Sequence, residues 1–245
     1  DSRNKPGKLY GIGKNSRGQI QPDGPDTIQE WYYMGFDDVV LMAGSSNEFA
    51  FIRKDGSLYA MGGGDNGGVP LGDSYRLDAN GNMGLNHPAT KVTHYQDDNG
   101  NLHEMPPVKY VTAGTAVFYV ITHDDKLMAY GSNGKGHAGV NKPSTAYITR
   151  PMYTGLSDVT DIAVYNTTAV ARVGTGSSAK FYLVGNNDKG QVYADTSKAT
   201  VEPVHTWQML DLSNAPTPGE TRPDDTSTAP VDPDPDTVGM PTNIN

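Results

Sequence analysis

The chain has 245 residues and no cysteine, and its 28 acidic residues against 19 basic ones give a net charge of −9. This charge excludes nucleic acid as an expected partner, and the lack of cysteine excludes disulfides, thiolate metal sites and a thiol nucleophile. No apolar run is long enough for a membrane span. Because the chain opens at Asp1 rather than Met, we expect that an upstream portion has been removed or left out.

The first element in chain order is an apolar run, Leu9–Gly13, followed by "GKNSRGQI" at Gly13–Ile20. The second segment is similar to a phosphate-binding loop, but Gln19 stands where that loop needs Lys and then Ser or Thr. The same five-residue glycine step occurs four times, which indicates architecture rather than one site. We expect these glycines to shape turns by adopting backbone angles that other residues resist. They are Gly13, Gly18, Gly62, Gly67, Gly131, Gly136, Gly185 and Gly190.

Each later copy repeats one order of elements before its glycine pair. An apolar strand, a glycine corner, an alternating strand, a turn and a closing strand fill Asp38–Gly62, Val108–Gly131 and Val159–Gly185. In the first of these, Asp55-Gly56 predicts a type I′ hairpin turn, which needs positive φ at both central residues. A strand-rich period near fifty residues is typical of propeller blades.

The repeat resembles that of the regulator of chromosome condensation family. The residues that carry the resemblance are "VVLMAG", "DGSLYAMG", "GKNSRGQI", "GSNGKGHAG" and "GNNDKGQVY". It implies an all-β fold, a β-propeller of four-stranded antiparallel blades, with three complete units and a partial one. The sequence departs from the family at the closing-strand Trp, which is replaced by Ile12, Met61, Tyr130 or Val184, and the family's His after the corner glycine is missing. A family propeller has about twice as many units, so the ring must be completed by other sequence or other chains.

The expected domain is a propeller over residues 1–212, with units near 1–35, 36–107, 108–157 and 158–212. Within it, Thr200–Leu212 is expected to form a final strand that locks the ring or docks on a neighbour. Residues 213–245 are rich in Pro, Asp and Thr, a composition typical of an extended or disordered tail.

Two insertions are candidate binding elements. The segment Lys91–Pro106 predicts an added hairpin around Asn99-Gly100, and such rim insertions often bind partners. Its candidate binding residues are His94, Asp97, Asn99 and His103. The segment Gln21–Gly35 holds Trp31, Tyr32 and Tyr33, which either pack against the neighbouring blade or form an exposed recognition anchor.

No catalytic residue, metal or cofactor is predicted. "VGTGSSA" at Val173–Ala179 precedes a strand rather than the helix that a dinucleotide loop requires, so it predicts a hairpin turn. Asp78–Asn82 and Asp97–Asn101 have some calcium-loop character, but neither continues to the required bidentate Glu. His94 and His103 are the only histidines that could face each other, across the inserted hairpin. A zinc site therefore has little support.

The leading hypothesis is a non-enzymatic interaction or structural module that binds a protein or glycan receptor through rim loops, within a larger assembly. The expected setting is extracellular or a virion surface, as in a fibre, tail or adhesion protein; a cytoplasmic setting is the alternative. Two other functions stay open. A carbohydrate-active propeller would need two carboxyl groups facing each other across a cleft. An intracellular exchange-factor-like regulator would bind a small GTPase.

Overall fold

The computed structural model describes residues 5–64, 67–72, 86–143, 145–192 and 203–210. The chain divides into two compact units, Asp1–Leu210 and Asp211–Asn245, and the second, which includes the predicted tail, lies outside the described residues. The described elements are strands apart from one short 3-10 helix. Among these residues, none of the helical structure is long and apolar enough to cross a membrane.

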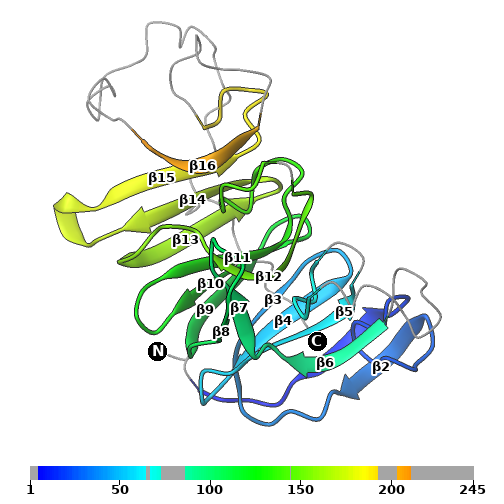
Figure 1. Ribbon diagram of the computed structural model, residues 1–245. Coiled ribbons are helices and arrows are strands. Elements are labelled where there is room, and N and C mark those ends of the chain that lie inside the picture. Colours follow the sequence, from blue (N-terminus) through cyan, green and yellow to red (C-terminus); the bar gives the residue numbers. More distant parts are fainter. Residues whose placement is uncertain (1–4, 65–66, 73–85, 144, 193–202, 211–245) are drawn as a thin grey trace, which may run out of the picture. The chain divides into compact units, whose positions relative to one another are not determined.

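The strands form one two-stranded sheet and three four-stranded antiparallel units, each in chain order (Figure 1). The first sheet has β1 (Tyr10–Lys14) and β2 (Thr27–Tyr33). The second has β3 (Val39–Gly44), β4 (Glu48–Arg53), β5 (Leu58–Gly63) and β6 (Asn86–Lys91). The third has β9 (Val108–Ala113), β10 (Val117–Thr122), β11 (Leu127–Ser132) and β12 (Tyr147–Tyr153). The fourth has β13 (Val159–Tyr165), β14 (Thr168–Val173), β15 (Lys180–Gly185) and β16 (Val204–Met209). Three complete blades and a partial one are therefore confirmed.

The predicted inserted hairpin is also confirmed. It consists of β7 (His94–Gln96) and β8 (Leu102–Glu104), which pair antiparallel. Although the insertion lies in the second repeat of the sequence, β7 pairs in parallel with β12 of the third, with Gln96 opposite Met152. The third sheet thereby gains two strands at its outer edge.

Neighbouring blades contact one another through their first strands and the turns that follow. β9 lies beside both β3 and β13. Between the second and third blades, the Ser45 hydroxyl donates to the Gly114 carbonyl (3.1 Å) and accepts from the Ala116 amide (2.8 Å). Between the third and fourth, the Thr115 amide donates to the Asn166 carbonyl. Because the third blade is covered on both faces, every residue of β10 is buried.

The glycine pairs shape the end of each third strand. All eight have positive φ, and the first glycine of each pair lies between 103° and 111°. Two residues later, Asn15, Asn133 and Asn187 are buried, and each side-chain oxygen accepts an amide five residues further on, at 2.9 to 3.2 Å. In these three copies the segment is thus a loop closed by its own asparagine, and in the first of them, "GKNSRGQI", this closure leaves no role for a phosphate in its folding.

Two expectations about turns have different outcomes. Gly56 has positive φ but Asp55 does not, and the Gly56 amide donates to the Arg53 carbonyl. The turn is therefore a three-residue loop with glycine in the left-handed position, and the type I′ expectation is wrong. The segment at Val173–Ala179 joins β14 to β15 through a single 3-10 turn (Gly176–Ser178), so the predicted hairpin turn is confirmed.

The expected final strand is present. Within Thr200–Leu212, β16 pairs with β15 as the fourth strand of the last blade. Trp207 on this strand lies edge-on to Tyr119 of β10, with ring centroids 6.3 Å apart. β16 therefore completes the fourth blade, and its Trp207 contacts the core of the third blade.

Candidate functional site

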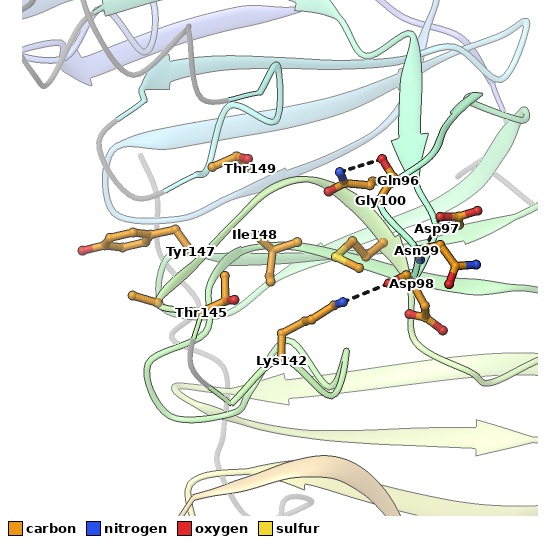
Figure 2. Close-up of a pocket in the computed structure, with 12 residues that line it drawn as sticks. Gln96, Asp97, Asp98, Asn99, Gly100, Lys142, Thr145, Tyr147, Ile148 and Thr149 are labelled. Carbon is orange, nitrogen blue, oxygen red and sulfur yellow. Dashed lines mark hydrogen bonds between the residues drawn. The ribbon is translucent and has the colours of Figure 1, made fainter.

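A groove separates the β7–β8 turn from the start of β12 and the loop before it. Its volume is about 620 Å³. The hairpin side contributes residues 96–100, and the opposite wall contributes Lys142, residues 145–149 and Met152 (Figure 2). The groove exists because β7 pairs with β12 at Met152 only, so the first half of β12 is left uncovered by the hairpin.

Asp97 holds the turn of this hairpin together. One carboxylate oxygen accepts the amides of Asn99 (2.9 Å) and Asn101 (2.8 Å). The other accepts the Asn101 side chain (3.0 Å) and lies 3.1 Å from Nε2 of His103. These bonds, above all those from Asn101 and His103, hold the pKa of Asp97 well below its usual range. Asp97 is therefore charged at ordinary pH and shapes the turn, rather than serving as a general acid.

The rest of the turn is fixed by its backbone. The Gly100 amide donates to the Asp97 carbonyl at 3.0 Å, and Gly100 has a φ of 89°. The Gln96 side chain donates to the Gly100 carbonyl at 3.1 Å. At the opposite wall, the Lys142 ammonium donates to the Asp98 carbonyl at 3.1 Å and bridges the groove (Figure 2). The groove is thus polar, with carboxylates on one side and an ammonium and threonine hydroxyls on the other.

His94 and His103, the two histidines that could have faced each other, do not do so. His103 stands opposite Tyr95 in the β7–β8 register and stacks on it, with ring centroids 5.1 Å apart. His94 stands opposite Glu104 and lies 2.9 Å from the Thr93 hydroxyl. Because neighbouring residues of a strand point to opposite faces, the two histidines lie on opposite faces of the hairpin. The idea that they face each other is wrong, and within the described part of the chain no group of three potential metal ligands gathers.

The other calcium candidate, Asp78–Asn82, lies outside the described residues. At Asp97–Asn101, the oxygens of Asp97 are engaged by protein donors, as in an ordinary asparagine-rich turn.

The aromatic triplet lies on β2, apart from the groove residues. Trp31 is 69% exposed, and Tyr32 and Tyr33 are exposed as well. Tyr33 packs on Tyr10 and donates its hydroxyl to Asp37 (2.6 Å), which raises the pKa of Tyr33 to about 12. Trp31 is therefore not packed against a neighbouring blade among the described residues, and its exposure leaves it as a second candidate anchor.

Asp97 and Asn99 were predicted from sequence and do line the groove, whereas Lys142, Thr145 and Tyr147 were not predicted. Their segment, "NKPSTAY", has the Asn, Pro and Ser of an ordinary turn and no binding motif in the sequence. Nothing in its composition indicates that a hairpin inserted some forty residues earlier along the chain would dock beside it.

Comparisons with known proteins show the fold. No family model and no curated protein sequence matches the chain. Among solved structures, Prp20p from Saccharomyces cerevisiae is similar, with a TM-score of 0.61 and 18% identity over 84% of this chain. Yeast RCC1 (Prp20), in its complex with Kap60, is similar with a TM-score of 0.60 and 19% identity over the same share of this chain. The fold is that of an RCC1-type β-propeller. The match spans 48% and 46% of those two chains, so this chain corresponds to about half of such a propeller.

The role of Asp97 in the groove can be tested by removing its carboxylate. We expect Asp97→Ala to release the amides of Asn99 and Asn101 and to speed their hydrogen exchange, while the thermal unfolding midpoint of the blades stays unchanged. Asp98→Ala is the matched control, because only the backbone carbonyl of Asp98 is engaged in the groove. Equal exchange in the two variants would show that the turn does not depend on Asp97.

Proposed function

We propose that this protein is a non-enzymatic interaction module whose partner binds in the groove between the β7–β8 turn and β12. The observation that carries the proposal is the docking of an inserted hairpin on the rim of a complete blade, which creates a polar groove on a rigid sheet. Rigid elements that carry variable loops are the usual way in which propellers display binding sites.

The chemistry of the groove suits an extended, polar segment of a protein. Asp97 and Asp98 both belong to the same turn, and the opposite wall presents Lys142 and hydroxyl side chains. Glycoside hydrolysis requires two carboxyl groups on opposite sides of the bond that is cleaved. The groove does not have that arrangement, and its acidic turn suits a partner with basic or amide side chains better.

The structural neighbours give independent support for protein binding. The Prp20p structure is described with its binding to Gsp1p and histones, and the second with Kap60 bound. An exchange-factor-like role is the second candidate because of this similarity. It predicts faster release of a labelled guanine nucleotide from a small GTPase when the full chain is added, and an unchanged rate would contradict it. A cell-surface or virion setting and a cytoplasmic one both remain predictions.

The groove can be tested by a steric block. The full chain is screened against a displayed library of random peptides and against a glycan array, and the selected ligands are then measured on variants. We expect peptides to be selected and Thr145→Arg to weaken their binding about tenfold or more, because the new guanidinium can pair with the Asp98 side and fill the groove. Thr175→Arg, exposed in the β14–β15 turn, is the matched control.

The same screen separates the competing sites. Ligands that are lost with Trp31→Ala but retained by Thr145→Arg would place binding on β2 and contradict the groove. Selection of glycans alone would contradict a protein partner.

A further inference from the structure

The fourth strand of each complete blade lies farthest from the blade's first strand, at the outer side of the sheet (Figure 1). Outer strands of this kind are usually guarded against pairing by proline or by charged side chains. β6 contains Pro88 and Lys91, and β12 contains Arg150 and Pro151. β16, with the sequence VHTWQM, contains no proline, no lysine or arginine and no acidic residue. Of the fourth strands of the three described blades, β16 is therefore the unguarded one.

Part of the β16 edge is covered by the loop of the preceding blade. The Asn141 amide donates to the His205 carbonyl at 3.2 Å, and the loop of the second blade makes the equivalent bond to β12. Further along β12, the inserted hairpin covers the edge at Met152. The counterpart of Met152 is Gln208, because the two pair with equivalent residues of β11 and β15. No described strand pairs with β16 on that side, so the second half of its edge is open.

The open half of β16 carries two residues whose backbone groups point outward. The Leu210 amide donates to the Phe181 carbonyl at 2.8 Å, so Leu210 faces β15. Because successive residues of a strand direct their backbone groups to opposite edges, Met209 and Trp207 face away from β15, as His205 does. Within the described part of the chain, neither Trp207 nor Met209 forms a backbone hydrogen bond on this outer side. Two amides and two carbonyls are therefore open to an added strand.

The side chains of the same two residues form an apolar strip beside the open edge. They lie on one face of the sheet, because they are two residues apart on a strand. Met209 is 55% exposed, and Trp207 is half-buried against Tyr119. Residues 203–210 contain no Lys, Arg, Asp or Glu, although the chain has a net charge of −9. Two copies of this edge can therefore approach without placing like charges opposite each other.

We propose that two copies of this protein associate by antiparallel pairing of their β16 edges about a twofold axis at Gln208. In this register Trp207 lies opposite Met209 of the partner subunit, and Met209 lies opposite the partner's Trp207. Because both positions face outward, each such pair exchanges two backbone hydrogen bonds, and all four open groups of each copy gain a partner. Each methionine sulfur also meets an indole ring, which is a favourable contact.

The occupant is a second copy because the strip is complementary to itself. An unrelated strand could satisfy the same backbone groups, but a copy of β16 also brings a methionine to each tryptophan and adds no charge. The Asn141 loop already occupies the edge at His205, so the paired segment is short and the dimer is expected to depend on protein concentration. The contact uses neither the groove nor the faces of the blades, and the inference is independent of the proposed function.

Sedimentation of the full chain over a range of concentrations tests the proposal. Met209→Pro removes an outward amide at a position where an edge strand tolerates proline, and Met209→Lys places a charge on the edge. We expect each to weaken the dimer about tenfold or more, and Met209→Ala, which keeps the amide, to weaken it less. Met42→Lys is the matched control, because Met42 is 58% exposed but lies on β3, and it is expected to dimerise as the natural chain does.

Cysteine cross-linking tests the register, since the natural chain has no cysteine. Gln208 faces the partner's Gln208 at a position where the two Cα atoms are about 4.5 Å apart, which is within the range of a disulfide. We expect Gln208→Cys to form a disulfide-linked dimer under mild oxidation. Thr206→Cys is the control, because Thr206 is exposed but lies opposite Leu210 of the partner subunit, and it is expected not to cross-link.

Circular dichroism checks that each variant folds, and Met209→Lys keeps the test valid if Met209→Pro does not. A natural chain that stays monomeric at every concentration overturns the proposal. So does a dimer that survives both Met209→Lys and Met209→Pro, that is lost with Met42→Lys, or that Gln208→Cys does not cross-link. Hydrogen-exchange protection of the Trp207 and Met209 amides that does not change with concentration also overturns it, because another segment of the same chain would then be the occupant.

Discussion

Replacing Gly131 by alanine is expected to abolish folding or to lower the free energy of unfolding by about 4 kcal/mol or more. Two effects add at this position. The residue has a φ of 105°, which a side chain resists, and an alanine Cβ would collide with the backbone carbonyl of Ala116. Because Ala116 directly precedes β10, in which every residue is buried, its carbonyl cannot move aside without disturbing the core. Urea denaturation measures the change.

Gly13→Ala is the matched control for this prediction. Gly13 has nearly the same φ, 103°, but a Cβ there would contact nothing. Only the backbone strain remains, so the loss is expected to be about 1–3 kcal/mol. An equal loss in the two variants would show that the contact with Ala116 contributes nothing.

Stability is expected to fall as the pH drops from 6.5 to about 4, and His137→Gln is expected to remove most of that fall. Burial, together with the nearby His205, lowers the pKa of His137 to about 4. Between this value and the ordinary value near 6.5, the unfolded chain binds a proton that the folded chain does not bind. Acid therefore favours unfolding, by up to about 3 kcal/mol once the pH reaches the folded pKa. Above pH 6.5 this histidine adds no pH dependence.

Glutamine fits this position because other repeats already carry it. Gln19 and Gln191 stand at the same place in the loop, and each side-chain oxygen accepts an amide two residues earlier at 2.8 Å. Urea midpoints at pH 7.5, 6 and 5 are compared with those of His123→Gln, which changes an exposed histidine in a turn. If both variants lose stability equally with acid, His137 is not the group responsible.

The repeat was readable from sequence because it depends on local geometry. A glycine ends each third strand, and in three of the four copies an asparagine two residues later closes the loop with its side chain; Gly64 stands at that position in the remaining copy. Strand order followed as well, because antiparallel neighbours in sequence are neighbours in space. The burial of equivalent residues was less predictable. Leu58 and Leu127 are buried, whereas Phe181, at the same position of the last blade, is exposed.

The sequence by itself determined the blade, its turns as places where the chain reverses, and the inserted hairpin around Asn99-Gly100. Only the tertiary structure decided where that hairpin docks, that His94 and His103 lie on opposite faces, and that Trp31 is exposed. The physical reason is the range of the interactions. Turn and strand patterns follow from neighbouring residues, whereas the groove with Lys142 depends on which distant strands become neighbours.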